Sequence, residues 1–213
     1  MDLYTFFNTF GGQAVTAIGL CLSMALIYML APKGESLPKL RTLAISALFI
    51  AAAFASNNFL PHISMPQGGS VTLFSMLLLY IPAYLFGPRV GMLAGISYGF
   101  LDLLIKPYAY FPLQVLLDYP IAFGMLGIGG FFKKEKSRYF YGFAAGVIGR
   151  FAASFLSGFI FFASYAPEGF SPVLWSAYYN GAYMGAELAL SLLVMPLPPL
   201  RSALSKMHSR YGL

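Results

Sequence analysis

The stretch Pro112-Leu113-Gln114-Val115-Leu116-Leu117-Asp118-Tyr119-Pro120 places one carboxylate inside an otherwise apolar segment that continues to Phe132. An ionised carboxylate that faces hydrocarbon costs several kcal/mol, so Asp118 needs a compensating group. Two such groups are conceivable. One is the guanidinium of Arg150, which lies in a later apolar segment, and the other is a cationic ligand.

The composition identifies the class of protein around this stretch. Of the 213 residues, 59% are hydrophobic and only 9% are charged, whereas a soluble domain carries roughly 25% charged residues. We therefore expect an all-α integral membrane protein in a lipid bilayer. The single cysteine, Cys21, excludes an internal disulfide. The net charge of +6 does not indicate nucleic-acid binding, because the basic residues fall in short loops.

Seven apolar segments are long enough to be membrane-spanning helices, which need about 20 residues each. They cover residues 10–31, 41–60, 72–87, 89–106, 112–132, 140–164 and 173–197. The first is not expected to be a cleavable signal peptide, because Asp2 and no basic residue precedes it.

The positions of the basic residues predict the orientation in the membrane. Eleven of the thirteen lie on one side if the N-terminus is outside: Lys33, Lys39, Arg41, Arg89, Lys133, Lys134, Lys136, Arg138, Arg201, Lys206 and Arg210. The two others are Lys106, in an outer loop, and Arg150, within a helix. We therefore expect an outer N-terminus and a cytoplasmic C-terminus.

The depths of Asp118 and Arg150 decide whether they can share a site. Asp118 lies six residues from the outer end of its helix, about 9 Å deep at 1.5 Å per residue. Arg150 lies about 15 Å from the cytoplasmic face, near the midplane of a roughly 30 Å core. Either the two side chains pair and hold their helices together, or Asp118 faces a cavity.

Several other residues lie at the depth of a cavity that opens outward. Arg150, Ser154 and Gly158 recur every four residues and share a helix face, on which Gly158 would leave room for a flat ring. Ser154 is either a ligand contact or bonded to the carbonyl four residues before it. The remaining candidates are Phe162, Trp175, Asn180, Tyr108 and the pair Gly68-Gly69.

Each of these candidates has a simpler structural explanation. Trp175 is also typical of an aromatic belt at the membrane interface, and Asn180 needs either a ligand or a cross-helix partner for its amide. Gly68-Gly69 permits a tight loop that dips over a cavity, or an ordinary surface turn. Together these groups suit a small, flat, aromatic and cationic solute.

The sequence lacks the motifs of several other functions. It has no Walker A motif and no HExxH metal pair, so we expect neither ATP hydrolysis nor a metal site. No nucleophile set for an intramembrane enzyme is present, and no cofactor is expected. Asp102 and Glu187 also lie in apolar segments, where they could stabilise helix packing or relay protons.

A strip of small residues on the helix of residues 41–60 can admit another helix at close range. It consists of Ala44, Ala47, Ala51 and Ala52. Ala47 and Ala51 lie four residues apart, the spacing of small-residue contacts between membrane helices. The strip could pack within the bundle or dock a partner subunit.

Three blocks of sequence resemble a known family: Met-Pro-Gln-Gly-Gly-Ser-Val (65–71), Leu-Gln-Val-Leu-Leu-Asp-Tyr-Pro-Ile-Ala-Phe (113–123), and the residues from Gly149 to Gly181. The resemblance is to the thiamine-specific substrate-binding (S) component of energy-coupling factor (ECF) transporters, the ThiT family. It implies a six-helix bundle that binds thiamine and partners a transmembrane coupling protein and two ATPases in the bacterial cell membrane. The chain then divides into an extra N-terminal helix with a cytoplasmic linker (1–36), the six-helix substrate-binding domain (37–200) and a basic cytoplasmic tail (201–213).

The resemblance also assigns roles to residues of this chain. Asp118 falls at an acidic position near the thiamine, Tyr119 at its neighbouring tyrosine, and Arg150 at a basic position. Gly158 falls beneath the ligand, Phe162 on a stacking aromatic, Asn180 on a pyrimidine contact, and Tyr108 on a loop tyrosine. Ala47 and Ala51 resemble the docking strip for the coupling protein.

The chain also departs from the family pattern. Ser154 replaces a ligand-contacting histidine, and Trp175 stands where a tyrosine is common. These departures leave a related pyrimidine or another vitamin as an alternative ligand. A solitary proton-coupled carrier that uses Asp102 or Glu187 is a further alternative.

Overall fold

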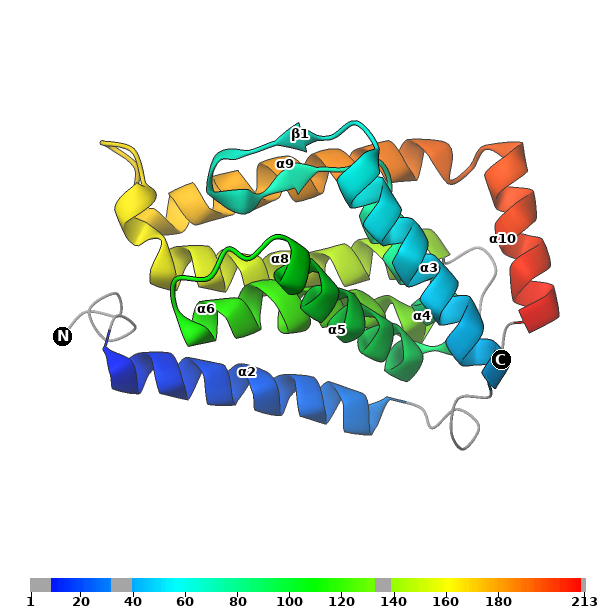
Figure 1. Cartoon of the computed structure of the whole chain (residues 1–213), viewed down its shortest axis with the longest axis horizontal. Coiled ribbons are helices and arrows are strands. Elements are labelled where there is room, and N and C mark those ends of the chain that lie inside the picture. The colour runs from blue at the N-terminus through cyan, green and yellow to red at the C-terminus, as the bar shows by residue number, and fades with distance from the viewer. Residues whose placement is uncertain (1–8, 32–39, 133–138, 212–213) are drawn as a thin grey trace.

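The computed structural model describes residues 9–31, 40–132 and 139–211, and these residues are mostly helical (Figure 1). Six of the basic residues used to predict the orientation lie outside the described residues: Lys33, Lys39, Lys133, Lys134, Lys136 and Arg138. The helices are α2 (Phe10–Leu30), α3 (Leu40–Phe59), α4 (Ser75–Phe86), α5 (Pro88–Ile105), α6 (Pro112–Leu116), η2 (Leu117–Ile121), α7 (Ala122–Met125), η3 (Leu126–Phe132), α8 (Tyr139–Phe161), α9 (Pro172–Val194) and α10 (Pro198–Tyr211).

Four helical stretches in the described part of the chain are long and apolar enough to cross a membrane. They are Leu40–Phe59, Pro88–Ile105, Pro112–Phe132 and Tyr139–Phe161, and a fifth span results if α9 and α10 are counted as one bent pair. Helix α2 has 21 residues, so it is about 32 Å long and matches the thickness of a bilayer core. The predicted all-α membrane fold is confirmed.

The third predicted span, residues 72–87, is wrong in its length. Helix α4 begins only at Ser75 and has 12 residues, so it is about 18 Å long and too short to cross a bilayer core alone. The chain enters it through Phe74, whose φ of 66° is left-handed and cannot belong to a right-handed helix. The residues before it instead form a small antiparallel hairpin, β1 (Ile63–Ser64) and β2 (Ser70–Val71), around the short η1 turn (Pro66–Gly68).

The last predicted span, residues 173–197, also ends earlier than expected. Helix α9 stops at Val194 and α10 follows at an angle of 88°. Prolines lack the N–H that a continuing helix needs and restrict the residue before them, and three of them occupy positions 196, 198 and 199. Helix α10 buries Leu204 against the core at the ends of the other helices, so most of the predicted tail is helical.

A stripe of glycines brings α5 against the helix that carries Asp118. Gly91, Gly95 and Gly99 recur every four residues. A Cβ on Gly95 would overlap the Phe123 carbonyl oxygen, and one on Gly99 would lie 2.6 Å from the Tyr119 carbonyl oxygen. Small residues at this spacing let two membrane helices approach backbone to backbone. The Asp118 helix therefore has a closely packed wall behind it.

The turn that contains Asp118 is a π-helix, Leu117–Ile121. Pro120 has no N–H to donate to the carbonyl of Leu116, four residues earlier, and its ring would clash with that carbonyl in an α-helix. The wider π turn accommodates the proline, and the N–H of Ala122 reaches back to the Leu117 carbonyl, five residues away. Such π turns are frequent at functional sites.

The close approach of α5 generates a prediction. Gly95→Ala should destabilise the protein by about 1–3 kcal/mol, because the added methyl forces two backbones apart, and should lower the midpoint of thermal unfolding in detergent. The matched control is Gly185→Ala on α9, where an added Cβ meets nothing within 4 Å. That variant should keep or raise the midpoint because alanine favours helix over glycine. Equal midpoints for both variants would contradict the close packing.

Candidate ligand-binding site

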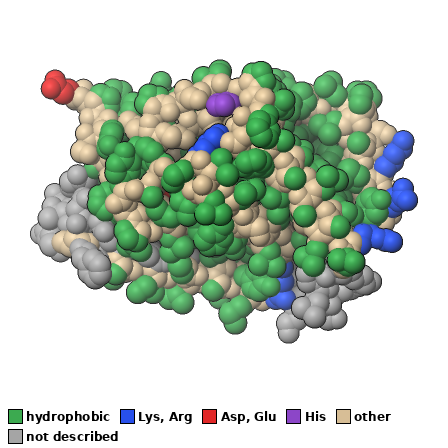
Figure 2. All heavy atoms as spheres, in the orientation of Figure 1, with side chains coloured by type: hydrophobic (Ala, Val, Ile, Leu, Met, Phe, Trp, Pro, Cys, Tyr) green, Lys and Arg blue, Asp and Glu red, His purple; other side chains and the backbone are tan. Residues whose placement is uncertain are grey.

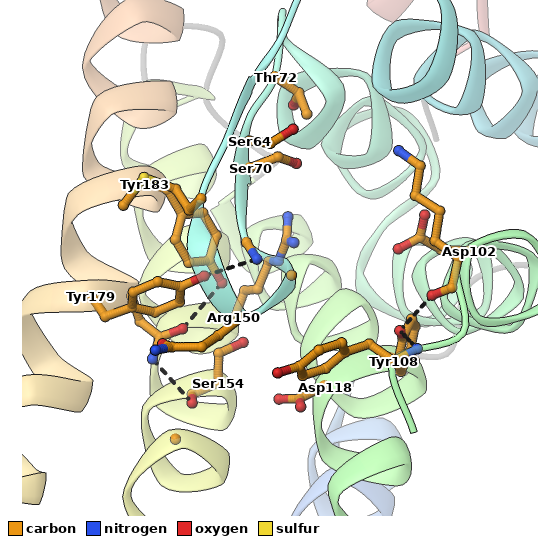
Figure 3. Close-up of a pocket in the computed structure, with 18 of the residues that line it drawn as sticks. Ser64, Ser70, Thr72, Asp102, Tyr108, Asp118, Arg150, Ser154, Tyr179 and Tyr183 are labelled. Carbon is orange, nitrogen blue, oxygen red and sulfur yellow. Dashed lines mark hydrogen bonds between the residues drawn. The ribbon is translucent and has the colours of Figure 1, made fainter. Parts of the chain in front are cut away.

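A cavity of about 440 Å³ lies between the hairpin, α5, the Asp118 helix, α8 and α9 (Figure 3). Pockets for small ligands span about 300–1,000 Å³. All eleven residues proposed from sequence as ligand contacts line this cavity: Gly68, Gly69, Tyr108, Asp118, Tyr119, Arg150, Ser154, Gly158, Phe162, Trp175 and Asn180. Their contact with a ligand stays a prediction, whereas their convergence on one space is a property of the structure.

Asp118 is held by Gln114, one turn earlier in the same helix. The Gln114 Nε2 donates to Asp118 Oδ2 at 2.7 Å and to the Tyr108 carbonyl at 2.9 Å, while its Oε1 accepts the Tyr110 N–H at 3.1 Å. Gln114 is fully buried. It links the carboxylate to the outer loop, although no role was predicted for it from the sequence. The signal available in the sequence was a second polar side chain four residues before the first.

Arg150 does not pair with Asp118. Among the described residues no ion pair joins the two, and Figure 3 shows the side chains apart. The guanidinium of Arg150 instead lies over the Phe123 ring, 4.1 Å from its centroid, and its buried Nε has no hydrogen-bond partner in the described part of the chain. Of the two alternatives for Asp118, direct pairing with arginine is therefore absent, and the carboxylate lines the cavity.

The hairpin loop, residues 63–71, lies against α9 at one side of the cavity. The Tyr179 hydroxyl accepts the Gly69 N–H at 2.9 Å and donates to the Pro66 carbonyl. Gly68, with a φ of +89°, lies against the Tyr108 ring, and a Cβ on Gly69 would come within 2.7 Å of the Tyr179 hydroxyl. The glycine pair thus belongs to a loop that dips onto the cavity rather than to an ordinary surface turn.

Aromatic rings line the end of the cavity near the outer loop. The Phe162 ring lies 5.7 Å from that of Tyr108, 6.3 Å from Tyr110 and 5.8 Å from Tyr165. Burial among these groups raises the pKa of the Tyr108 hydroxyl above its ordinary value. Trp175 packs on Tyr179 with centroids 6.2 Å apart. These faces suit a flat aromatic group.

Two predicted residues on the α8–α9 side have structural partners already. The Asn180 Nδ2 donates to the carbonyls of Ser154 and Ser176 at 3.3 and 3.0 Å, and its Oδ1 accepts from the Tyr183 hydroxyl at 3.1 Å. A Cβ on Gly158 would overlap Ser176 Oγ. The missing side chain of Gly158 therefore admits helix α9, and that Gly158 also makes room for a flat ring stays a prediction.

Tyr119 lines the cavity, and its hydroxyl bonds to the loop that follows α5. It accepts the Tyr108 N–H at 2.9 Å and donates to the Lys106 carbonyl at 2.8 Å. The side chain therefore fixes the backbone of the loop after α5, which carries Tyr108 over the cavity.

Glu187 and Asp102, left open between packing and proton relay, both have polar partners. The buried Glu187 carboxylate accepts from Thr72 Oγ1 at 2.6 Å, Ser75 Oγ at 3.2 Å and the Met76 N–H at 2.7 Å. A carboxylate at the start of α4 is favourable because helix N-termini leave N–H groups unpaired. Asp102 accepts from Asn57 Nδ2 at 3.0 Å. Glu187 thus has a clear role in packing.

The alanine strip on α3 faces away from the bundle. Ala44, Ala47 and Ala51 are exposed, while Ala52 is half-buried. The exposed leucines Leu40 and Leu48 flank the strip on the same helix. Packing within the bundle therefore does not explain the strip at its first three positions, which leaves lipid or a partner protein as its neighbour.

These features define an integral membrane protein with a polar, aromatic-lined cavity for a small molecule. Residues 43–206 match the model of the family described as thiamine transporter protein (Thia_YuaJ). The chain therefore belongs to this family, which is one of transporters rather than enzymes. Helix α2 lies outside the matched residues.

Individual proteins agree with the family assignment. The chain is 34% identical over 149 residues to the thiamine transporter ThiT of Bacillus subtilis, covering 63% of this chain and 77% of the relative. It is 31% identical over 168 residues to ThiT of Lacticaseibacillus paracasei, covering 68% and 81%. The solved structure of ThiT from Listeria monocytogenes has the same fold, with a TM-score of 0.69 at 23% identity, covering 79% of this chain and 97% of that one.

The contact between the hairpin loop and Tyr179 generates a second prediction. Tyr179→Phe removes the hydroxyl that bonds both Gly69 and Pro66, and each hydrogen bond contributes about 0.5–1.5 kcal/mol. We expect hydrogen exchange in residues 65–71 to rise roughly fivefold to a hundredfold, by the same estimate for two bonds. The control is Tyr178→Phe. Tyr178 is the neighbouring residue in the sequence, and its own side chain is 64% exposed. Exchange that rises equally in both variants would contradict this anchoring.

Proposed function

We propose that this chain captures thiamine in a cavity that opens to the outside, as the S component of an ECF-type importer. The observation that carries the proposal is that Asp118 lines an aromatic cavity without an ion pair in the described part of the chain. Thiamine carries a permanent thiazolium charge that would meet this carboxylate, and two flat rings that would stack on Phe162 and Tyr108.

The distribution of charge around the cavity supports a cationic ligand. Three acids, Asp102, Asp118 and Glu187, line it together with the cationic side chains of Lys106 and Arg150 and with the imidazole of His62. Glu187 is engaged at the start of α4, and Asp102 is bonded to Asn57. Asp118 accepts from Gln114 Nε2, and like Asp102 it has acceptor capacity left for a positively charged group.

The orientation and partners follow from the same proposal. With the N-terminus outside and the C-terminus cytoplasmic, the hairpin loop and Tyr108 lie on the outer side of the bacterial plasma membrane. The chain has no Walker A motif, so energy would come from two ATPases through a transmembrane coupling protein. The exposed residues Ala47 and Ala51 are the proposed docking strip for that coupling protein.

The role of Asp118 can be tested by calorimetry. Asp118→Asn keeps the shape of the side chain but removes its charge, and bonds to charged groups contribute about 1.5–3 kcal/mol. We expect thiamine affinity to fall by roughly 10- to 150-fold, and the affinity for a neutral analogue with an uncharged ring in place of the thiazolium to fall less. Unchanged affinity for thiamine in this variant would show that the charge of Asp118 does not contribute to ligand binding.

Ser154 provides the reason to test other ligands in the same experiment. Ser154 lines the cavity. It stands at the position where the family that this chain resembles has a ligand-contacting histidine. A related pyrimidine that binds more tightly than thiamine would replace thiamine as the ligand. The carboxylate assignment would then be tested with that compound.

The docking strip can be tested separately from ligand capture. Ala51→Trp places a large ring on the exposed strip of α3, so it should abolish ATP-dependent uptake into vesicles that contain the coupling protein and ATPases. Thiamine binding should remain, because Ala51 does not line the cavity. The control is Ala189→Trp, at an exposed position of α9. Uptake in vesicles without any ATPase would instead favour a solitary ion-coupled carrier.

A further inference from the structure

Helix α2 lies beyond the family match and nevertheless packs on the segment that carries Asp118. The family model covers residues 43–206, whereas α2 contacts α5, α6 and the π turn, and Figure 1 shows it running alongside them. None of its described residues lines the cavity. Any effect of α2 on a ligand must therefore pass through the residues that lie between them.

Met24 is the residue of α2 that reaches into the bundle. It is buried and clusters with Leu117, Ile121 and Ala122. Leu117 and Ile121 are the first and last residues of the π turn, so the cluster that contains Met24 includes both ends of the turn, with Asp118 between them. A Cβ on Gly124 would overlap the end of the Met24 side chain, so this glycine leaves the space that Met24 occupies.

Arg89 holds the C-terminal end of α2. Its Nε donates to the Tyr28 carbonyl at 3.1 Å and its Nη2 to the Met29 carbonyl at 3.2 Å, and the guanidinium lies 5.1 Å from the centroid of the Tyr28 ring. The last carbonyls of a helix have no partners within it, and a positive charge there is favourable. The bundle thus offers a specific dock for α2, formed at the first turn of α5.

We propose that α2 is a brace that positions the Asp118 π turn for ligand binding. A π turn around a proline has fewer regular hydrogen bonds than an α-helix and opens more easily. The glycines of α5 support one side of this helix, and Met24 supports another, while the side with Asp118 lines the cavity. Restricting the turn keeps the carboxylate in its binding position and slows ligand release.

The test uses the full chain in lipid nanodiscs, with two disruptive variants. Met24→Ala removes the packed side chain, and Arg89→Gln removes the charge from the dock. We expect hydrogen exchange in residues 114–124 to rise roughly tenfold, because the turn loses a packed neighbour. Thiamine release, followed by stopped-flow fluorescence, should accelerate by a similar factor. Arg89→Lys, which keeps the charge, should recover part of the loss.

Matched controls separate a brace from general destabilisation. Met29→Ala changes a methionine of the same helix that is 72% exposed, and Arg41→Gln removes an exposed charge at the start of α3. Both should leave exchange and release unchanged. Unchanged exchange in residues 114–124 in both disruptive variants would overturn the brace, whatever happens to thiamine.

The two readouts also distinguish this inference from the proposed function on which its ligand part rests. Faster exchange together with faster release supports both. Faster exchange with unchanged thiamine release, or with no thiamine binding in any variant, supports the brace of the π turn. That outcome counts against Asp118 as the ligand contact and so against the proposed function.

Discussion

A carboxylate at membrane depth must find donors or positive charge, and much of this structure follows from how Asp118 meets that requirement. Its partner in the protein is the amide of Gln114, which also binds the backbone of the outer loop at Tyr108 and Tyr110. Arg150, the charge that could have neutralised it, lies over Phe123 instead. The carboxylate is therefore oriented by a neutral donor and is not paired with Arg150.

The packing around Asp118 is tight on one side and open on the other. At the glycine stripe of α5, two helix backbones are in contact and leave no space between them. On the side of α8 and α9, the polar side chains surround a cavity, which the hairpin loop borders through Tyr179. A close-packed wall resists deformation, so movement that admits a ligand is expected in the hairpin loop rather than in the Asp118 helix.

Sequence patterns predicted the membrane class, most helices and the residues that converge on the cavity. They succeeded because apolar length reveals spans, and because polar residues at a common depth must share partners. They failed where the outcome depends on local backbone geometry. Leu73 and Phe74 read as part of an apolar span, yet the left-handed backbone at Phe74 starts α4 late. Pro120 indicates an irregular turn at this point of the helix, but the length of an apolar segment carries no information about a π turn.

The roles of individual polar groups were harder to predict than their location. Gly158 and Asn180 do line the cavity, but the contact of α8 with α9 also engages them. Only the three-dimensional packing shows which side chain is already satisfied. Gln114 was missed for the opposite reason, since an amide in an apolar run gives no indication of the loop carbonyl that it will meet.

Most polar groups around the cavity are thus held in place before any ligand arrives. A ligand needs to order few side chains, because five of those that line the cavity already form hydrogen bonds within the protein. They are Tyr119, Tyr179, Tyr183, Asn180 and Gln114. Pre-organisation of this kind reduces the entropy cost of binding.

The same arrangement concentrates selectivity in the groups with spare hydrogen-bonding capacity, above all Asp118 and Arg150. A cationic ligand would gain most from Asp118, because a buried charge interacts strongly where water is excluded. The same reasoning explains why support for the Asp118 turn matters, since a displaced carboxylate would lose that gain while every other contact stayed in place.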